Sequence, residues 1–294
     1  MNCVYKNIFE LYVGIDNRRI DFGKCCVINE LEDFGHISFD DFYNLSDFWS
    51  FLNFRYSILP ANHHFETCQH TFCNNDKVCD WRNEPLKEIR VNLNSCNLNC
   101  IMCHNDHRFT RESMEVYFNI LRLIKGHNLN KIILTTGGEP FLKKNETIEY
   151  IESLKQSDCK ILEIITNATL LNEEDIRRIK KTTDMNGISC KIQVSLDSTD
   201  KEIYCKIRNA TEKQFETVMK NIDVLKETEM LYGVNIVMMP ENEHTCYDDC
   251  LYWKNKGVYV HILPVRYDNG VGACKIQKTI EKIKKDFPEF YGDA

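Results

Sequence analysis

Three cysteines stand close together in the middle of the chain, at Cys96, Cys100 and Cys103. Three thiolates within so short a stretch can wrap one small metal core, and thiolate is the ligand that iron–sulfur clusters and structural zinc sites both use. A zinc site would take its fourth ligand from His104 or His107. The triplet therefore predicts a metal centre, with an iron–sulfur cluster favoured over zinc because zinc sites more often use cysteine pairs with two-residue gaps.

A second group of cysteines, at Cys68, Cys73 and Cys79, precedes the triplet, and the adjacent pair Cys25 and Cys26 lies further upstream. One thiolate from that pair would complete a shell of four, which suits either an iron–sulfur cluster or zinc. Zinc would also find substitute ligands in nearby histidines, namely His63, His64 and His70. Unligated thiols are the third interpretation of this group.

A glycine-rich turn, Gly137–Pro140, follows a β-rich run further along the chain. Paired glycines let backbone groups approach a ligand closely, and the carboxylate of Glu139 can accept hydrogen bonds from a cationic amine. The same residues also make an ordinary turn before a helix. A ligand-binding role for this turn therefore depends on what lies beside it.

Further polar residues stand at the ends of later β-rich runs. Ser195 and Asp197 are two residues apart on a strand and point the same way, so both can reach one polar target such as ribose hydroxyls; capping of the next loop is the alternative. Asn167 ends an earlier run, and Met238, which also suits a core position, ends a later one. Arg208 is either a ligand contact or a solvated arginine.

These residues need a scaffold, and the sequence from Glu88 onward alternates β-rich runs with amphipathic helical patterns. Such alternation predicts an α/β fold with a parallel sheet, either an open doubly wound sheet or an incomplete barrel. Periodicity alone does not separate these two. The resemblance to a known family, given below, implies a partial (β/α)6 TIM-like barrel, whose catalytic groups gather on loops after the strands, where all these residues fall. The six expected strands are 89–93, 131–135, 161–165, 191–196, 234–238 and 258–263, with helices around 114–124, 148–154, from 172, 215–225 and 247–254.

The first part of the chain has a different composition, rich in aromatic residues, Asn and Asp, and it shows no strand–helix rhythm. We expect a boundary near Glu84 and Pro85. The predicted domains are residues 1–87, a small cysteine-rich accessory domain, and residues 88–294, the barrel with a short C-terminal helix.

Composition excludes several classes of partner. A net charge of −7 without a basic tract argues against nucleic acid, and no apolar run approaches the roughly 20 residues that cross a bilayer. The start of the chain lacks an apolar signal segment, so a cytoplasmic location is expected. Fifteen cysteines in such a protein favour metal binding or catalysis over disulfides.

The Cx3Cx2C spacing from Cys96 to Cys103, placed after the first strand, resembles the signature of the radical S-adenosylmethionine (radical SAM) superfamily. The resemblance covers roughly Glu88 to Pro264. It implies that the three cysteines hold a 4Fe-4S cluster whose fourth iron is left for the amino and carboxylate groups of S-adenosylmethionine. It also implies reductive cleavage of that cofactor to a 5′-deoxyadenosyl radical, which abstracts hydrogen from a substrate carbon.

The resemblance extends to the other motifs. It implies that the turn at Glu139 holds the methionine amino group, that Ser195 and Asp197 contact the ribose, and that Arg208 approaches the cofactor carboxylate. Met102 stands where the family commonly has an aromatic residue. The implied cofactor-binding residues are Met102, Gly137, Gly138, Glu139, Pro140, Asn167, Ser195, Asp197, Arg208 and Met238.

The cysteine-rich N-terminal segment resembles a SPASM or twitch accessory domain, which normally follows the barrel rather than preceding it. This resemblance favours an auxiliary 4Fe-4S cluster on Cys68, Cys73, Cys79 and one of Cys25 or Cys26. It also makes peptide or protein maturation the first expected function, with an electron donor such as flavodoxin or ferredoxin. The alternatives are radical dehydrogenation or epimerisation of a carbohydrate or small metabolite, and a zinc-binding scaffold or regulatory protein.

Overall fold

The computed structural model describes residues 8–13, 18–23, 35–58, 86–93, 95–103, 110–134, 137–265 and 271–291. Its strands form one nine-stranded sheet in the order β3-β2-β1-β4-β5-β6-β7-β8-β9. The six strands predicted from the sequence are confirmed and pair in parallel, each with the next along the chain: β4 (Glu88–Leu93), β5 (Lys131–Leu134), β6 (Ile161–Thr166), β7 (Ser189–Ser195), β8 (Leu231–Met238) and β9 (Val260–Pro264). Because the order of these six strands, β4 to β9, never reverses, they have no switch point of the doubly wound kind, and they form a partial (β/α)6 barrel.

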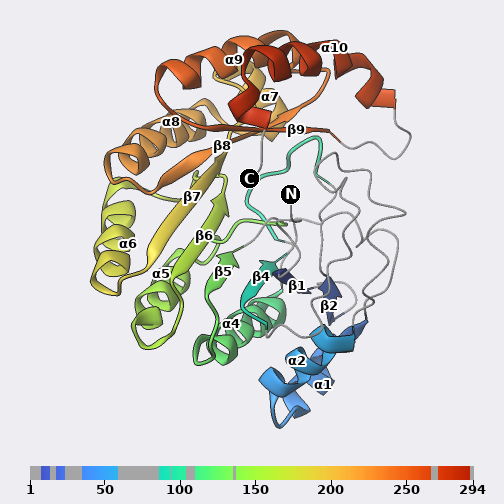
Figure 1. Ribbon diagram of the computed structural model, residues 1–294, viewed down its shortest axis with the longest axis vertical. Helices are drawn as coiled ribbons and strands as arrows, with labels where there is room; N and C mark the ends of the chain where they lie inside the picture. Colours follow the sequence, from blue (N-terminus) through green and yellow to red (C-terminus); the bar gives the residue numbers. More distant parts are fainter. Residues whose placement is uncertain are drawn as a thin grey trace.

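The helices lie along the outer side of this curved sheet (Figure 1). Their bounds are α4 (Arg111–Lys125), α5 (Lys144–Ser153), α6 (Glu173–Met185), α7 (Lys201–Arg208), α8 (Glu212–Glu227), α9 (Glu243–Asn255) and α10 (Val271–Asp286), with short 3-10 turns η3 (Leu154–Gln156) and η4 (Pro288–Tyr291). Two of these helices begin at polar caps, since Thr110 accepts the Ser113 N–H at the start of α4 and Asn172 accepts the Asp175 N–H at the start of α6. No helix in the described ranges has the length and apolar character needed to span a bilayer.

The core lies between the sheet and the helices. Alternate strand residues such as Val91, Ile164 and Val194 are fully buried on the face that meets the helices. The opposite, concave face is more polar, and it carries an ion pair between Lys131 and Glu163 with an N–O distance of 2.6 Å. Apolar burial on the outer face therefore fixes the register that brings the strand ends into one row.

Elements before residue 87 join the same sheet, which the sequence did not predict. β1 (Ile8–Val13) pairs in parallel with β4, β2 (Arg19–Gly23) is antiparallel to β1, and β3 (His36–Ser38) is antiparallel to β2. Two helices follow, α1 (Phe39–Asn44) and α2 (Phe48–Ile58). The domain division at residue 87 stays a prediction, but these strands are hydrogen-bonded into the barrel sheet.

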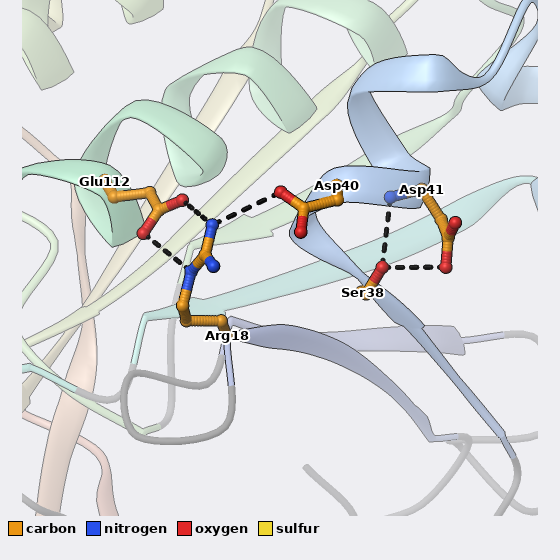
Figure 2. A network of polar contacts seen from close by, with 5 residues as sticks. All are labelled: Arg18, Ser38, Asp40, Asp41 and Glu112. Carbon is orange, nitrogen blue, oxygen red and sulfur yellow. Dashed lines mark hydrogen bonds and ion pairs between the residues drawn. The ribbon is translucent and has the colours of Figure 1, made fainter.

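Arg18 ties this N-terminal part to the barrel (Figure 2). Its guanidinium bonds both carboxylate oxygens of Glu112, in the first turn of α4, with an Nε–Oε2 distance of 3.0 Å, and it also contacts Asp40 of α1 at 3.3 Å. On the neighbouring α2, the Trp49 ring stacks on His127, with 4.3 Å between the ring centroids. These contacts hold α1 and α2 beside α4.

Candidate active site

The loop after β4 carries the cysteine triplet. Cys96 and Cys100 are partly buried, whereas Cys103 is exposed, and the Cys103 N–H bonds the Cys100 carbonyl at 3.0 Å. In the described part of the chain, no three His, Cys, Asp or Glu side chains converge as ligands of a single metal ion do. The three thiols belong to one short loop, residues 96–103. This arrangement fits a polynuclear cluster, in which each thiolate ligates a different iron.

The loop after β6 holds the first of these cysteines. The side-chain amide of Asn167 donates to the Cys96 sulfur at 3.5 Å and to the Asn97 Oδ1 at 3.0 Å. Asn97 in turn donates to the Thr169 hydroxyl at 2.8 Å. The sequence analysis singled out Asn167 but missed Asn97 and Thr169. The only feature of the sequence that could have indicated these two is that each is a short polar residue next to a motif. Together they dock the cysteine loop onto the end of β6.

Glu139, after β5, is 1% exposed and accepts three hydrogen bonds from the protein. One carboxylate oxygen accepts the Phe141 N–H at 3.0 Å and the Thr166 hydroxyl at 2.8 Å, and the other accepts the Asn167 N–H at 2.8 Å. Burial raises the pKa of the Glu139 carboxyl to about 7, although these hydrogen bonds oppose the rise. The carboxylate thus fixes the loop after β6, and its contact with a cofactor amine stays a prediction.

The neighbouring residues of the glycine-rich turn pack against the cysteine loop. The Glu139 N–H donates to the Ser95 carbonyl at 2.8 Å, immediately before Cys96. A Cβ added to Gly138 would lie 2.0 Å from the Leu93 carbonyl oxygen, which no side chain allows. Pro140 is buried, and its carbonyl accepts the Thr147 hydroxyl at 2.6 Å. Gly138 is therefore required by the approach of two backbones, whatever ligand it also contacts.

Asp197 and Arg208 form a buried ion pair beside the second cysteine. The Asp197 carboxylate is fully buried, accepting the Val237 N–H at 2.9 Å and contacting the Arg208 Nε at 2.6 Å. The Arg208 Nη1 donates to the Cys100 sulfur at 3.9 Å. Both carboxylate oxygens of Asp197 are thus engaged by the protein, and its predicted contact with ribose, like that of Arg208 with the cofactor carboxylate, stays untested.

Among the remaining predicted residues, Ser195 is partly buried at the end of β7 and Met102 is partly buried against the core. Met238 is fully buried in the core at the end of β8. Gly137 is partly exposed beside Gly138. Cys25, Cys26, Cys68, Cys73 and Cys79, with the histidines proposed as their substitutes and His104 and His107, lie outside the described residues.

The end of β7 is held by residues that the sequence analysis did not single out. Asp249 of α9, 1% exposed, accepts the Ser198 hydroxyl at 3.0 Å and the Thr199 N–H at 2.8 Å. Asp200 then caps α7 by accepting the Ile203 N–H. A Ser-Thr-Asp run before a charged amphipathic stretch is a cap signal, and it would have predicted α7.

We expect Glu139→Gln to lower the free energy of unfolding by about 1 to 3 kcal/mol, because the amide nitrogen leaves a buried donor facing another donor. Denaturant unfolding of the metal-free protein measures this. Glu149→Gln, on the exposed side of α5, is the matched control and should stay within about 0.5 kcal/mol of the parent chain. Equal stability of the two variants would contradict the structural role of the Glu139 carboxylate.

Comparison with known proteins agrees with this site. The family model "Radical SAM superfamily" matches residues 93–250, which include the cysteine loop, the glycine-rich turn and Arg208. A relative named "Probable GTP 3',8-cyclase" from Methanococcus aeolicus is 30% identical, over 70% of this chain and 69% of the relative. A "GTP 3',8-cyclase" from Staphylococcus epidermidis is 25% identical, over 74% of this chain and 68% of the relative.

Among solved structures, the one described as "Native anSMEcpe with bound AdoMet" matches with a TM-score of 0.47 and 19% identity, covering 60% of this chain and 51% of that chain. The sequence matches carry the assignment, and the family model includes the cysteine triplet and the strands β5 to β8. The chain belongs to the radical SAM superfamily.

Proposed function

We propose that this enzyme cleaves S-adenosylmethionine reductively and directs the resulting 5′-deoxyadenosyl radical at a carbon–hydrogen bond of its substrate. Family membership implies a 4Fe-4S cluster and S-adenosylmethionine as cofactors. The observation that supports the proposal is the docking of the cysteine loop onto the loops after β5 and β6 and onto the last turn of α7, through Ser95, Asn167 and Arg208. In barrels this edge of the sheet is where catalytic groups gather.

The cofactors supply the electron and the carbon radical when bound, and the residues of this chain supply the position. Cys96, Cys100 and Cys103 are the proposed ligands, and three thiolates leave one iron open for the amino acid part of the cofactor. Gly137, Gly138, Pro140 and Glu139 border that loop, so the amine end is proposed to lie there. Because burial raises the pKa of Glu139 to about 7, an adjacent ammonium group would favour its ionised form.

The test is chemical. Protein reconstituted anaerobically with iron and sulfide and reduced with dithionite should convert S-adenosylmethionine into 5′-deoxyadenosine and methionine. We expect iron–sulfur absorption in the visible range before reduction. Colourless protein that contains stoichiometric zinc and forms no 5′-deoxyadenosine would instead support the scaffold alternative.

The substrate class is a finer proposal. The relatives named for GTP favour a small molecule carrying a sugar or nucleotide, whereas the cysteine-rich segment before the barrel favours a peptide. Deuterium transfer into 5′-deoxyadenosine separates them: GTP deuterated on its ribose carbons is the first probe, and peptides deuterated at Cα are the second. Label from only one probe identifies the class.

We also propose an auxiliary 4Fe-4S cluster on Cys68, Cys73, Cys79 and one of Cys25 or Cys26. Four thiolates are the usual ligand set of such a cluster, and the resemblance of this segment to a SPASM or twitch domain supports it. A low-potential one-electron donor of the flavodoxin or ferredoxin class is the proposed physiological reductant.

A further inference from the structure

Two of the three proposed cluster ligands receive hydrogen bonds from side chains on other elements of the barrel. Cys96 accepts from Asn167, after β6, at 3.5 Å and from the Leu98 N–H at 3.4 Å. Cys100 accepts from Arg208, at the end of α7, at 3.9 Å. Each donor brings the positive end of an N–H group next to a sulfur that is a proposed cluster ligand.

Arg208 is built into this position rather than reaching it from solvent. It is 7% exposed, and its Nε contacts the fully buried Asp197 at 2.6 Å. The other Asp197 oxygen accepts the Val237 N–H of β8, so the carboxylate that orients the guanidinium is itself fixed by the sheet. A planar guanidinium can serve two partners at once, which an ammonium group does less well.

A backbone hydrogen bond also joins the cysteine loop to the end of α7. The Ile101 N–H of the cysteine loop donates to the Ile207 carbonyl at 2.9 Å, next to Arg208. The α7 helix then ends at Arg208, and the next residue, Asn209, caps it with a left-handed backbone at a φ of 52°. The last turn of α7 therefore holds the cysteine loop by one backbone bond and one side-chain bond.

We propose that Arg208, oriented by Asp197, sets the reduction potential of the cluster through its hydrogen bond to the Cys100 sulfur. The one-electron reduction adds negative charge to the cluster and its thiolates. A cation that donates to a ligand sulfur stabilises that reduced form, and hydrogen bonds to sulfur are a known lever on cluster potentials. This role is separate from a contact with the cofactor carboxylate, because it operates before any cofactor binds.

The experiment is a redox titration of reconstituted protein without S-adenosylmethionine, followed by electron paramagnetic resonance of the reduced cluster. Arg208→Gln should make reduction less favourable by about tenfold, which corresponds to a midpoint potential about 59 mV more negative for a one-electron couple. Lys206→Gln, which removes the same charge from an exposed position two residues away on α7, should leave the potential unchanged. Iron content is measured in every sample so that only loaded protein is compared.

Two further variants keep the test decisive if Arg208→Gln takes up too little iron. Arg208→Lys keeps the positive charge but loses the planar guanidinium that contacts both Asp197 and Cys100. We expect its midpoint potential to shift in the same direction as that of Arg208→Gln, by less than half as much. Asn167→Ala removes the donor to Cys96 and should also lower the potential, with Arg208 intact. The proposal is overturned if loaded Arg208 variants titrate like the parent chain, if Lys206→Gln shifts the potential equally, or if a shift emerges only after S-adenosylmethionine is added.

Discussion

Changing Cys96, Cys100 or Cys103 singly to alanine should abolish formation of 5′-deoxyadenosine from S-adenosylmethionine. The physical reason is that each thiolate ligates a different iron, so the loss of one leaves the cluster without a complete set of protein ligands. The product is measured by chromatography after anaerobic reduction with dithionite, alongside iron and sulfide content. The expected result for each variant is no product above the level formed without protein.

Cys205→Ala is the matched control, because Cys205 is a partly buried thiol on α7 with no place in the proposed ligand set. It should retain both iron and cleavage. A single-cysteine variant that still cleaves the cofactor at the parental rate would remove that residue from the ligand set. A variant with Cys96, Cys100 and Cys103 all changed to alanine also tests the auxiliary cluster. If the N-terminal cysteines hold a second cluster, about four irons should remain of the about eight in the parent protein, and if they do not, none should remain.

The second large effect is expected from Gly138→Ala. The added Cβ would lie 2.0 Å from the Leu93 carbonyl oxygen, 2.3 Å from the Ser95 carbonyl oxygen and 2.8 Å from the Ser95 nitrogen. All three are backbone atoms, so the turn and the cysteine loop must move apart. Overpacking against side chains costs about 1 to 3 kcal/mol, and we expect a loss of at least the upper value here because no flexible side chain can yield.

Denaturant unfolding gives the stability of this variant, and iron uptake shows whether the displaced loop still assembles a cluster. Gly126→Ala is the control, since a Cβ there meets nothing within 4 Å and the residue has a φ of −81° that alanine adopts freely. We expect the control to load iron normally. If Gly138→Ala matched it in both stability and iron, the close approach of the two backbones would not be a requirement of the fold.

Much of the barrel could be predicted from the sequence because local signals and tertiary packing agree there. Apolar residues at strand or helix spacing mark the six parallel strands, and the residues at Thr110 and Asn172 mark helix starts. The N-terminal strands escaped prediction for a physical reason: they are short, and β1, which joins them to the barrel, pairs with β4, many residues away in sequence. Pairing over such a distance leaves no local pattern.

The site divides in the same way. Motif spacing brought the cysteine triplet and the glycine-rich turn forward as candidates, but it did not show what each side chain contacts. The ligand contacts expected of Glu139 and Asp197 stay predictions, and the structure adds that their carboxylates accept hydrogen bonds from Thr166, Asn167 and Val237. The type of a residue at a strand end indicates which groups its side chain can bind. The packing of the adjacent loops decides which protein groups actually contact that side chain.

The pairing of β1 with β4 has a consequence for where this chain tolerates cutting or fusion. Residues before the compositional boundary cover one long side of β4, so a fragment that starts at residue 88 would leave the unpaired N–H and C=O groups of β4 facing water. An uncovered strand edge recruits other strands, including those of a second molecule. The N-terminal segment thus shields the barrel from self-association, and a fusion partner is better joined at the exposed surface loops than at this seam.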